Sequence, residues 1–150
     1  MKILLIGNNT DYNVLIAANL LVGGDIEHIF LSADIDLLLK QDLSYPIYMG
    51  KYKTHEVYAL KIVNDVKLAY KIINQFLKLF NFSEDAILVI PIYYNYYLFS
   101  RLLSYLISIL NNTLIGKYAL GLNVSLQLKN LNYQITLVKA RINQLDETCS

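Results

Sequence analysis

Hydrophobic and polar residues follow two different periods along the chain, and these periods predict strands and helices in turn. Residues 2–7 ("KILLIG") form a continuous apolar run that ends in glycine, which is typical of a strand buried on both faces. Residues 10–24 then carry apolar side chains at helical spacing and end at Gly23-Gly24, so they predict a helix. Thr10 is a candidate N-cap of this helix.

The middle of the chain continues this alternation. Residues 26–32 predict a second strand and residues 33–41 a short helix, and "YPIYMG" (45–50) with "HEVYALKIV" (55–63) predicts irregular extended structure around a third strand. Residues 64–80 are amphipathic and predict a surface helix. Residues 86–92 ("AILVIPI") predict another buried strand, and residues 96–112 predict a helix that is apolar on most of its circumference.

The final third of the chain changes period. "NVSLQLK" (123–129) alternates apolar and polar residues, and "YQITLVK" (133–139) continues this pattern after a polar stretch at Asn130 to Asn132. This pattern predicts an antiparallel hairpin from Val124 to Lys139. The expected fold is therefore a single α/β domain over residues 1–150, a Rossmann-like, doubly wound and mostly parallel sheet with a C-terminal antiparallel β-hairpin.

Composition narrows the classes of function. A chain of 150 residues with 55% hydrophobic and 17% charged residues is one folded domain, and its apolar excess predicts a homodimer in which part of that surface is covered. A net charge of +1 gives no broad basic field of the kind that holds duplex DNA.

The single cysteine, Cys149, supports neither a disulfide framework nor a thiolate metal site, so we expect a reducing, cytoplasmic location. The apolar run at the start is too short for the core of a signal peptide. Residues 91–110 approach the length of a membrane span, but Asn95, Arg101 and the three serines within them argue against insertion.

Two loops are expected at the carboxyl edge of the sheet, where open α/β sheets bind ligands: "GNNTDYN" (7–13) and "IYYNYY" (92–97). The first loop lacks the later glycines of GxGxxG, and the chain contains no GxxxxGK[ST], HExxH or GxSxG motif. A nicotinamide dehydrogenase, a P-loop hydrolase, a zinc enzyme and a serine hydrolase are therefore not expected, and neither a metal nor a cofactor is predicted. His28 and His55 are interpreted as structural residues.

From Asn64 onward, "NDVKLAYKIINQFLKLFNFSEDAILVIPIYYNYYLFSRLLSYLI" presents an amphipathic helix, an acidic turn, an apolar strand, a polar-aromatic loop and an apolar helix. Together with the strand, polar loop and helix at the start and the expected hairpin at the end, this order resembles the CRISPR-associated Rossmann fold family. The family's usual glycine-rich, lysine-bearing stretch after the late strand is replaced here by "IYYNYY".

The resemblance implies a homodimer that binds a cyclic oligoadenylate across its two-fold axis, either cleaving it as a metal-independent ring nuclease or sequestering it. The residues assigned to ligand binding are Asn8, Asn9, Tyr93, Tyr94, Asn95 and Arg101, and those assigned to catalysis are Thr10 and Lys117. Asparagine and threonine supply donors to phosphate and ribose, tyrosine supplies a face for adenine, and the cations offset phosphate charge.

Each of these residues also has a structural interpretation. Thr10 caps a helix, the tyrosines are amphipathic core residues, Arg101 forms an ion pair, and Lys117 is a solvated loop residue. The alternative function is accordingly a non-catalytic protein-interaction or structural accessory domain of archaeal or viral origin.

Overall fold

The computed structural model describes residues 1–8, 13–24, 45–63, 65–83, 86–93, 109 and 114–148, and within the last range the side chains of residue 122 and residues 125–147. The sequence-predicted segments 26–32, 33–41 and, apart from Ile109, 96–112 lie outside these residues.

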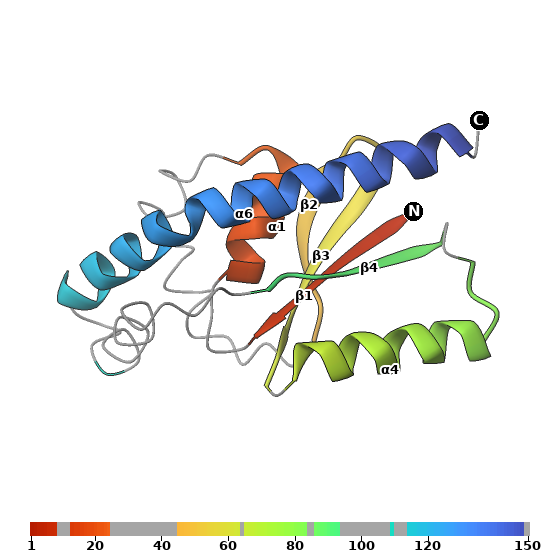
Figure 1. Ribbon diagram of the computed structural model, residues 1–150, viewed down its shortest axis with the longest axis horizontal. Helices are drawn as coiled ribbons and strands as arrows, with labels where there is room; N and C mark the ends of the chain where they lie inside the picture. The colour runs from red at the N-terminus through yellow and green to blue at the C-terminus, as the bar shows by residue number, and fades with distance from the viewer. Residues whose placement is uncertain are drawn as a thin grey trace.

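The described strands form one mixed sheet in the order β2-β3-β1-β4 (Figure 1). Its members are β1 (Lys2–Asn8), β2 (Ile47–Tyr52), β3 (His55–Ile62) and β4 (Ile87–Pro91). The central strand β1 pairs in parallel with β3 and with β4, and only the edge strand β2 runs antiparallel, to β3. The prediction of an α/β fold with a mostly parallel sheet is confirmed.

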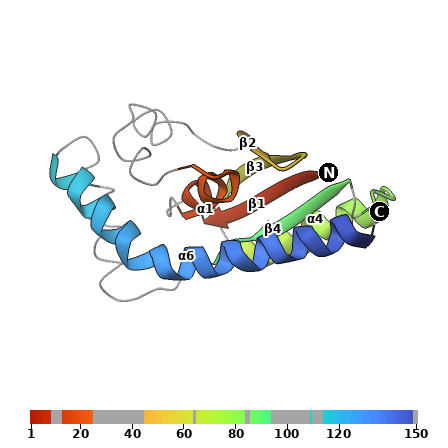
Figure 2. The same cartoon turned by 90° about the horizontal axis from the view of Figure 1, so that it is seen from above.

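The described helices cover both faces of this sheet. They are α1 (Asn13–Val22), α4 (Val66–Leu79) and α6 (Leu114–Thr148). Ile3 and Leu5 of β1 belong to the core that contains α1 and α6, whereas Ile6 is fully buried outside that core, on the opposite side of the strand, where α4 packs against β1 and β4. Figures 1 and 2 show α1 and α6 on one side of the sheet and α4 on the other.

Local sequence explains where these helices start and stop. The carboxylate of Asp65 accepts hydrogen bonds from the backbone N–H groups of Lys67 (2.8 Å) and Leu68 (3.3 Å), so Asp65 caps α4. Gly23 takes a φ of 87° after the last turn of α1, a left-handed conformation that glycine adopts without strain. The stop of α1 at Gly23 agrees with the sequence prediction, whereas the cap at Asp65 was not predicted.

The predicted hairpin from Val124 to Lys139 is wrong, because the whole stretch from Leu114 to Thr148 is one helix of 35 residues. Buried side chains recur at helical spacing along it, at Leu131, Ile135, Val138 and Ile142. The alternation at residues 124–128 is short, and Asn130 to Asn132 contains no glycine of the kind that two-residue hairpin turns require. The longer helical period therefore prevails.

The antiparallel hairpin of this fold lies earlier, between β2 and β3. Residues 55–62, interpreted from sequence as part of an irregular region, form a regular strand in which residues 55, 57, 59 and 61 are buried and the intervening ones are partly exposed. Lys53, with a φ of 54°, and Thr54 make the turn. An antiparallel edge on an otherwise parallel sheet is common in α/β folds.

The carboxyl-terminal turns of α6 are joined to the β2–β3 turn by polar contacts. The Lys53 ammonium donates to the Asp146 carboxylate at 3.0 Å and to Asn143 at 2.7 Å, and His55 Nε2 lies 2.8 Å from the other Asp146 oxygen. The hydrogen bond from Lys53 lowers the pKa of Asp146, desolvation opposes this shift, and the hydrogen bond with His55 adds to it. One carboxylate thus holds two residues of the hairpin.

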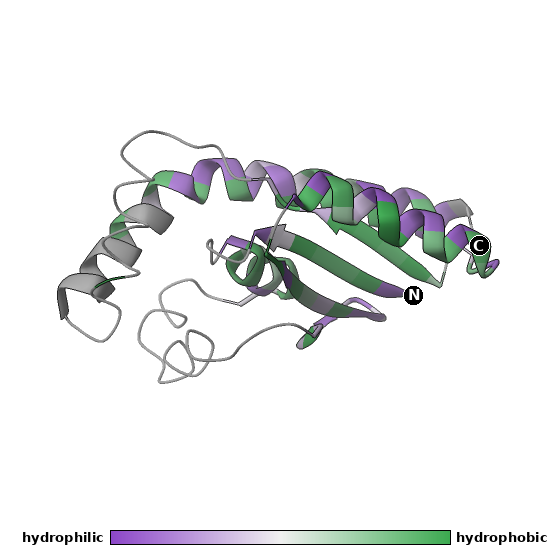
Figure 3. Cartoon of the chain, turned by 90° about the horizontal axis from the view of Figure 1, so that it is seen from below, coloured by the Kyte–Doolittle hydropathy of each residue, from purple (hydrophilic) through white to green (hydrophobic). Residues whose placement is uncertain are grey.

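Helix α4 leaves apolar side chains uncovered. Its exposed apolar residues are Leu68, Ile72, Phe76 and Leu79, and Phe80 and Phe82 follow them. Figure 3, which is coloured by hydropathy and seen from below, shows α4 on the β4 side of the sheet beside the hydrophobic strands. A search of the described residues for a helix long and apolar enough to cross a membrane finds none.

Leu131→Ala and Leu126→Ala distinguish the helix from the predicted hairpin. Leu131 is 1% exposed and Leu126 is 49% exposed, whereas a hairpin would bury Leu126 and place Leu131 in its turn. We expect Leu131→Ala to lower the free energy of unfolding by about 2–5 kcal/mol and Leu126→Ala by less than about 1 kcal/mol. Urea denaturation measures both, and the reverse order would contradict the helix.

Asp146→Asn should destabilise the protein in a pH-dependent way. Because the pKa of Asp146 is lowered on folding, its charge stabilises the folded state above the ordinary value of 3.8, and this contribution is lost as the pH falls through the lower folded value. Urea denaturation of wild type and variant should therefore differ at neutral pH and converge in acid. Glu147→Gln, which removes the same charge at the next residue, is the control and should show little change at either pH.

Candidate functional site

The carboxyl ends of the parallel strands meet at one edge of the sheet. Gly7 pairs in register with Lys61 of β3, Asn8 pairs with Ile62, and Ile6 pairs with Pro91 of β4. Open α/β sheets bind ligands at this edge, at the position where the strand order reverses. Here the chain returns to β3 on one side of β1 and then crosses to β4 on the other side, so the reversal falls at β1.

The amino end of α1 is held against this edge by direct contact with β1. A Cβ atom added at Gly7 would lie 2.7 Å from Val14 Cβ, closer than real side chains come, so only glycine allows this approach. The first turn of α1 therefore sits at the end of β1, with backbone N–H groups that have no partner within the helix. Such groups and the positive end of the helix dipole favour an anion.

Lys61 brings a buried positive charge to the same edge. It follows Val57 and Ala59 on the face of β3 that packs on α1, and it is 7% exposed. Burial lowers the pKa of its ammonium, because a desolvated charge is less favourable than a neutral amine. Lys61 therefore brings positive charge to the carboxyl edge, where an anion would interact favourably with it.

Two buried amides accompany Lys61. Asn13, the first residue of α1, is 7% exposed, and its Nδ2 group has no hydrogen-bond partner. Gln127 of α6 is 1% exposed and lies two turns before Gln134, which contacts Tyr93 at the end of β4, so Gln127 lies roughly 10 Å nearer the start of α6 than this contact. Asn13 and Lys61 are thus two of the four buried polar residues that the structure describes, the others being Gln127 and His55.

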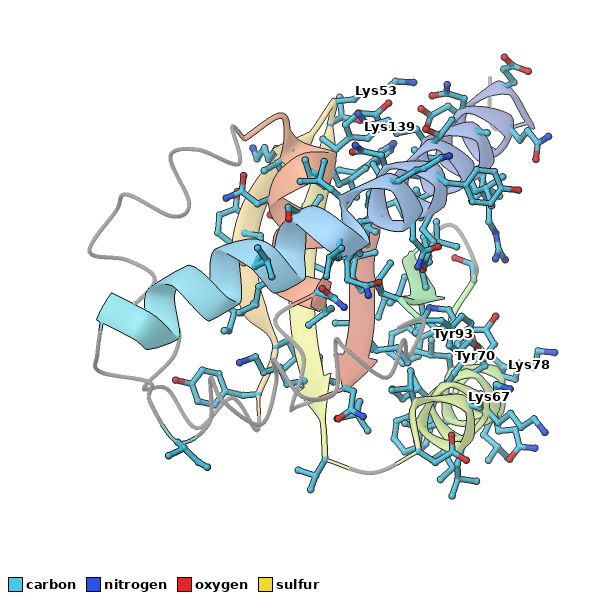
Figure 4. The ribbon with its side chains drawn as sticks, turned by 60° about the vertical axis from the view of Figure 1, so that its left-hand side comes forward. Lys53, Lys67, Tyr70, Lys78, Tyr93 and Lys139 are labelled. Carbon is cyan, nitrogen blue, oxygen red and sulfur yellow. The ribbon has the colours of Figure 1, made fainter. Side chains whose placement is uncertain are left out.

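Tyr93 closes the end of β4. Its backbone N–H donates to the side-chain oxygen of Gln134 at 3.0 Å, and its C=O accepts from the Gln134 amide at 2.8 Å. Tyr93 is 42% exposed, and the centroid of its ring lies 6.0 Å from the Lys67 ammonium nitrogen. Partial burial raises the pKa of the phenol, and Tyr70 and Asp65 raise it further. Figure 4 shows Tyr93 beside Tyr70 and Lys67 of α4.

The structure locates some of the residues assigned from sequence. Asn8 ends β1 at the carboxyl edge and Tyr93 follows β4 at the same edge, as predicted. Lys117 lies in α6, so its interpretation as a loop residue before a hairpin is wrong. Asn9, Thr10, Tyr94, Asn95 and Arg101 lie outside the described residues.

Sequence reasoning missed Asn13, Lys61 and Gln127. The signal for Lys61 was its place in "HEVYALKI", where a lysine occupies the same side of the strand as Val57 and Ala59. A charged residue in a buried alternation requires an explanation, and an anion site is one. Asn13 and Gln127 carried no comparable signal, because their burial depends on the packing of α6.

Other parts of the described structure give weaker support for a ligand site. A hollow of about 500 Å³ at the amino edge of the sheet is lined by Lys2 and Lys51 together with Glu56, so its charges are mixed. A search of the described residues finds no cluster of three or more histidine, cysteine or acidic side chains that would hold a metal ion.

Comparison with known proteins identifies a family. The family model described as "Protein of unknown function (DUF3189)" matches residues 27–140, which is more than half of the chain. The chain belongs to the DUF3189 family. No match was found among curated proteins or among solved structures. Of the site described above, Lys61, Tyr93 and Gln127 fall within the matched range of DUF3189, and Asn8 and Asn13 precede it.

The arrangement in this DUF3189 protein supplies hydrogen-bond donors and positive charge to one edge of the sheet. The ammonium of Lys61, the Asn13 amide and the first turn of α1 all favour a ligand that accepts hydrogen bonds and carries negative charge. A phosphate group has both properties.

Lys61 should make anion binding sensitive to pH. Because its pKa is lowered, its charge is lost before that of exposed lysines as the pH rises, and affinity for pyrophosphate should fall between neutral pH and about pH 10. Thermal denaturation with and without pyrophosphate measures this.

Lys61→Met should remove the stabilisation by pyrophosphate at every pH. Lys139→Met is the control and should leave the stabilisation unchanged, because Lys139 lies against Tyr52 near the other end of the sheet. Equal stabilisation of both variants would contradict the assignment.

Proposed function

We propose that this protein binds a phosphate-bearing nucleotide at the carboxyl edge of its sheet, and that the nucleotide is a cyclic oligoadenylate. The observation that carries the first part is the burial of Lys61 on the face and at the edge where Asn13 begins α1 with an unpartnered amide. The amide donor of Asn13 is costly to bury without an acceptor, and a ligand phosphate beside the positive charge of Lys61 would supply one.

The choice of an adenylate rests on the aromatic surface and on the sequence resemblance. Tyr93 presents a half-exposed ring at the same edge, and aromatic rings stack on nucleobases. The resemblance adds Asn9, Thr10, Tyr94, Asn95 and Arg101 as further ligand contacts.

We interpret the fold as doubly wound in the Rossmann manner, and we place the protein in the cytoplasm.

A homodimer is part of the proposal. The exposed apolar residues of α4 give a surface that association would cover, since contiguous apolar patches mark interaction sites. A cyclic ligand that lies on a two-fold axis contacts the same residues of both copies. One ligand would then bind two chains.

Cleavage, if it accompanies binding, needs no metal and no protein nucleophile. A ribose 2′-hydroxyl attacks the adjacent phosphorus, the 5′-oxygen leaves with a proton, and a 2′,3′-cyclic phosphate results. The protein would hold the attacking and leaving oxygens in line and stabilise the developing charge. Thr10 would orient the ribose, and Lys117 would offset the charge on the phosphate.

Calorimetric titration with cyclic tri-, tetra- and hexa-adenylate tests the proposed function. We expect one of them to bind with one ligand per two chains. At a concentration a hundredfold above its dissociation constant, it should raise the unfolding free energy by about 2.7 kcal/mol, which is roughly 5–10 °C in midpoint. Tyr93→Ala should weaken binding at least tenfold, because it removes a stacking surface.

Control variants and ligands distinguish a nucleotide site in general from a site for a cyclic adenylate. Tyr133→Ala removes an exposed tyrosine from the outer face of α6 and should bind like wild type. Binding of linear adenosine phosphates but of no ring would retain the nucleotide site and reject the cyclic ligand. Absence of binding to any adenylate would leave the protein-interaction domain as the better account.

A further inference from the structure

The outer side of β4 is an open sheet edge among the described residues. The Lys2 N–H donates to Ala86 C=O at 2.8 Å, and the Ile92 N–H donates to Ile6 C=O at 2.8 Å, so the even-numbered residues of this segment direct their backbone groups toward β1. By the alternation of a parallel ladder, Ile87 and Val89 direct theirs away from the sheet. These groups are available to a further strand.

Gln134 of α6 already imitates such a strand at one position. Its amide group accepts from the Tyr93 N–H and donates to the Tyr93 C=O, at 3.0 and 2.8 Å. This is the pair of bonds that a neighbouring strand would make with an outward-directed residue. The outer edge is therefore closed at Tyr93, and the stretch that remains runs from Ile87 to Val89, since Pro91 has no N–H to donate.

A groove of about 310 Å³ follows this remaining stretch between α4 and α6. Its floor is formed by Ile87 to Val89, one wall by Tyr70, Asn74 and other residues of α4, and the other wall by Arg141 of α6. Figure 4 shows Tyr70 of α4 beside Tyr93, which follows β4. The size is at the lower end of that of small-ligand pockets, which fits two or three residues of extended chain.

The charges of the groove have one sign. Among the described residues that line it, Lys71, Lys78 and Arg141 are charged and none is acidic. Lys71 and Lys78 are seven residues apart on one helix, which separates them by roughly 10 Å along its axis. Alternate side chains of an extended peptide lie on one side and are roughly 7 Å apart, so two acidic side chains two residues apart can each reach one lysine.

We propose that this groove binds an extended acidic peptide as an added strand on β4. The peptide backbone hydrogen-bonds to Ile87 and Val89, two acidic side chains two residues apart pair with Lys71 and Lys78, and the side chain between them is directed toward α6 and Arg141. Backbone pairing at a sheet edge supplies affinity in this mode, and complementary charge selects the partner. The site is separate from the carboxyl edge, so its occupation does not depend on a nucleotide.

Fluorescence anisotropy with the labelled peptide acetyl-Thr-Glu-Val-Glu-Thr-amide tests the proposal. The peptide should bind the wild-type protein, and Lys78→Glu should weaken binding at least tenfold. Lys67→Glu, which makes the same charge change on the same helix but outside the groove, should change it less than about twofold. The peptide with lysine in place of both glutamates should bind Lys78→Glu more tightly than it binds wild type.

Methylation of single peptide amides separates strand addition from attraction between charges. Only alternate amides of an added strand pair with β4, so of two peptides methylated at adjacent residues one should lose binding and the other should retain it. If both bind as well as the parent peptide, the groove is an acidic-ligand site without strand pairing, and the proposal is wrong. If no peptide binds and Lys78→Glu only promotes aggregation, the cations protect the edge from association, which equally overturns it.

Discussion

Close contact between β1 and α1 at Gly7 is the constraint on which the rest of the structure depends. Because Gly7 has no side chain, Val14 packs directly on the strand, and the first turn of α1 is fixed at the carboxyl edge. This contact places the buried amide of Asn13 on the same face and at the same edge as Lys61, whose neighbour in register is Gly7 itself. A larger residue at position 7 would displace the helix and separate the two groups.

Helix α6 connects the two ends of the sheet. Gln134 binds the backbone of Tyr93 at the carboxyl edge, and Asp146 contacts the β2–β3 turn at the other end. The buried stripe from Leu131 to Ile142 holds it against α1 and the strands between these points. The same helix therefore contributes to the proposed nucleotide site, forms one wall of the groove beside β4, and stabilises the antiparallel edge.

Local patterns were sufficient for the elements with short, unambiguous signals. The apolar runs of β1 and β4, the glycine stop of α1 and the amphipathic pattern of α4 are properties of neighbouring residues. They predicted these elements and the place of Asn8 and Tyr93. The error in α6 arose because alternation over residues 124–128 outweighed a longer helical period. Lys61 and Gln127 were missed because the burial of a polar side chain is a property of tertiary packing.

The central claim is that the carboxyl edge of the sheet is an anion site built around Asn13 and Lys61. The most direct measurement is a pair of nitrogen–proton correlation spectra recorded with and without pyrophosphate. The account predicts that the Asn13 side-chain amide and the backbone amides of the first turn of α1 show the largest shifts. Largest shifts around Lys2 and Lys51 at the opposite edge, or no shifts at all, would contradict it.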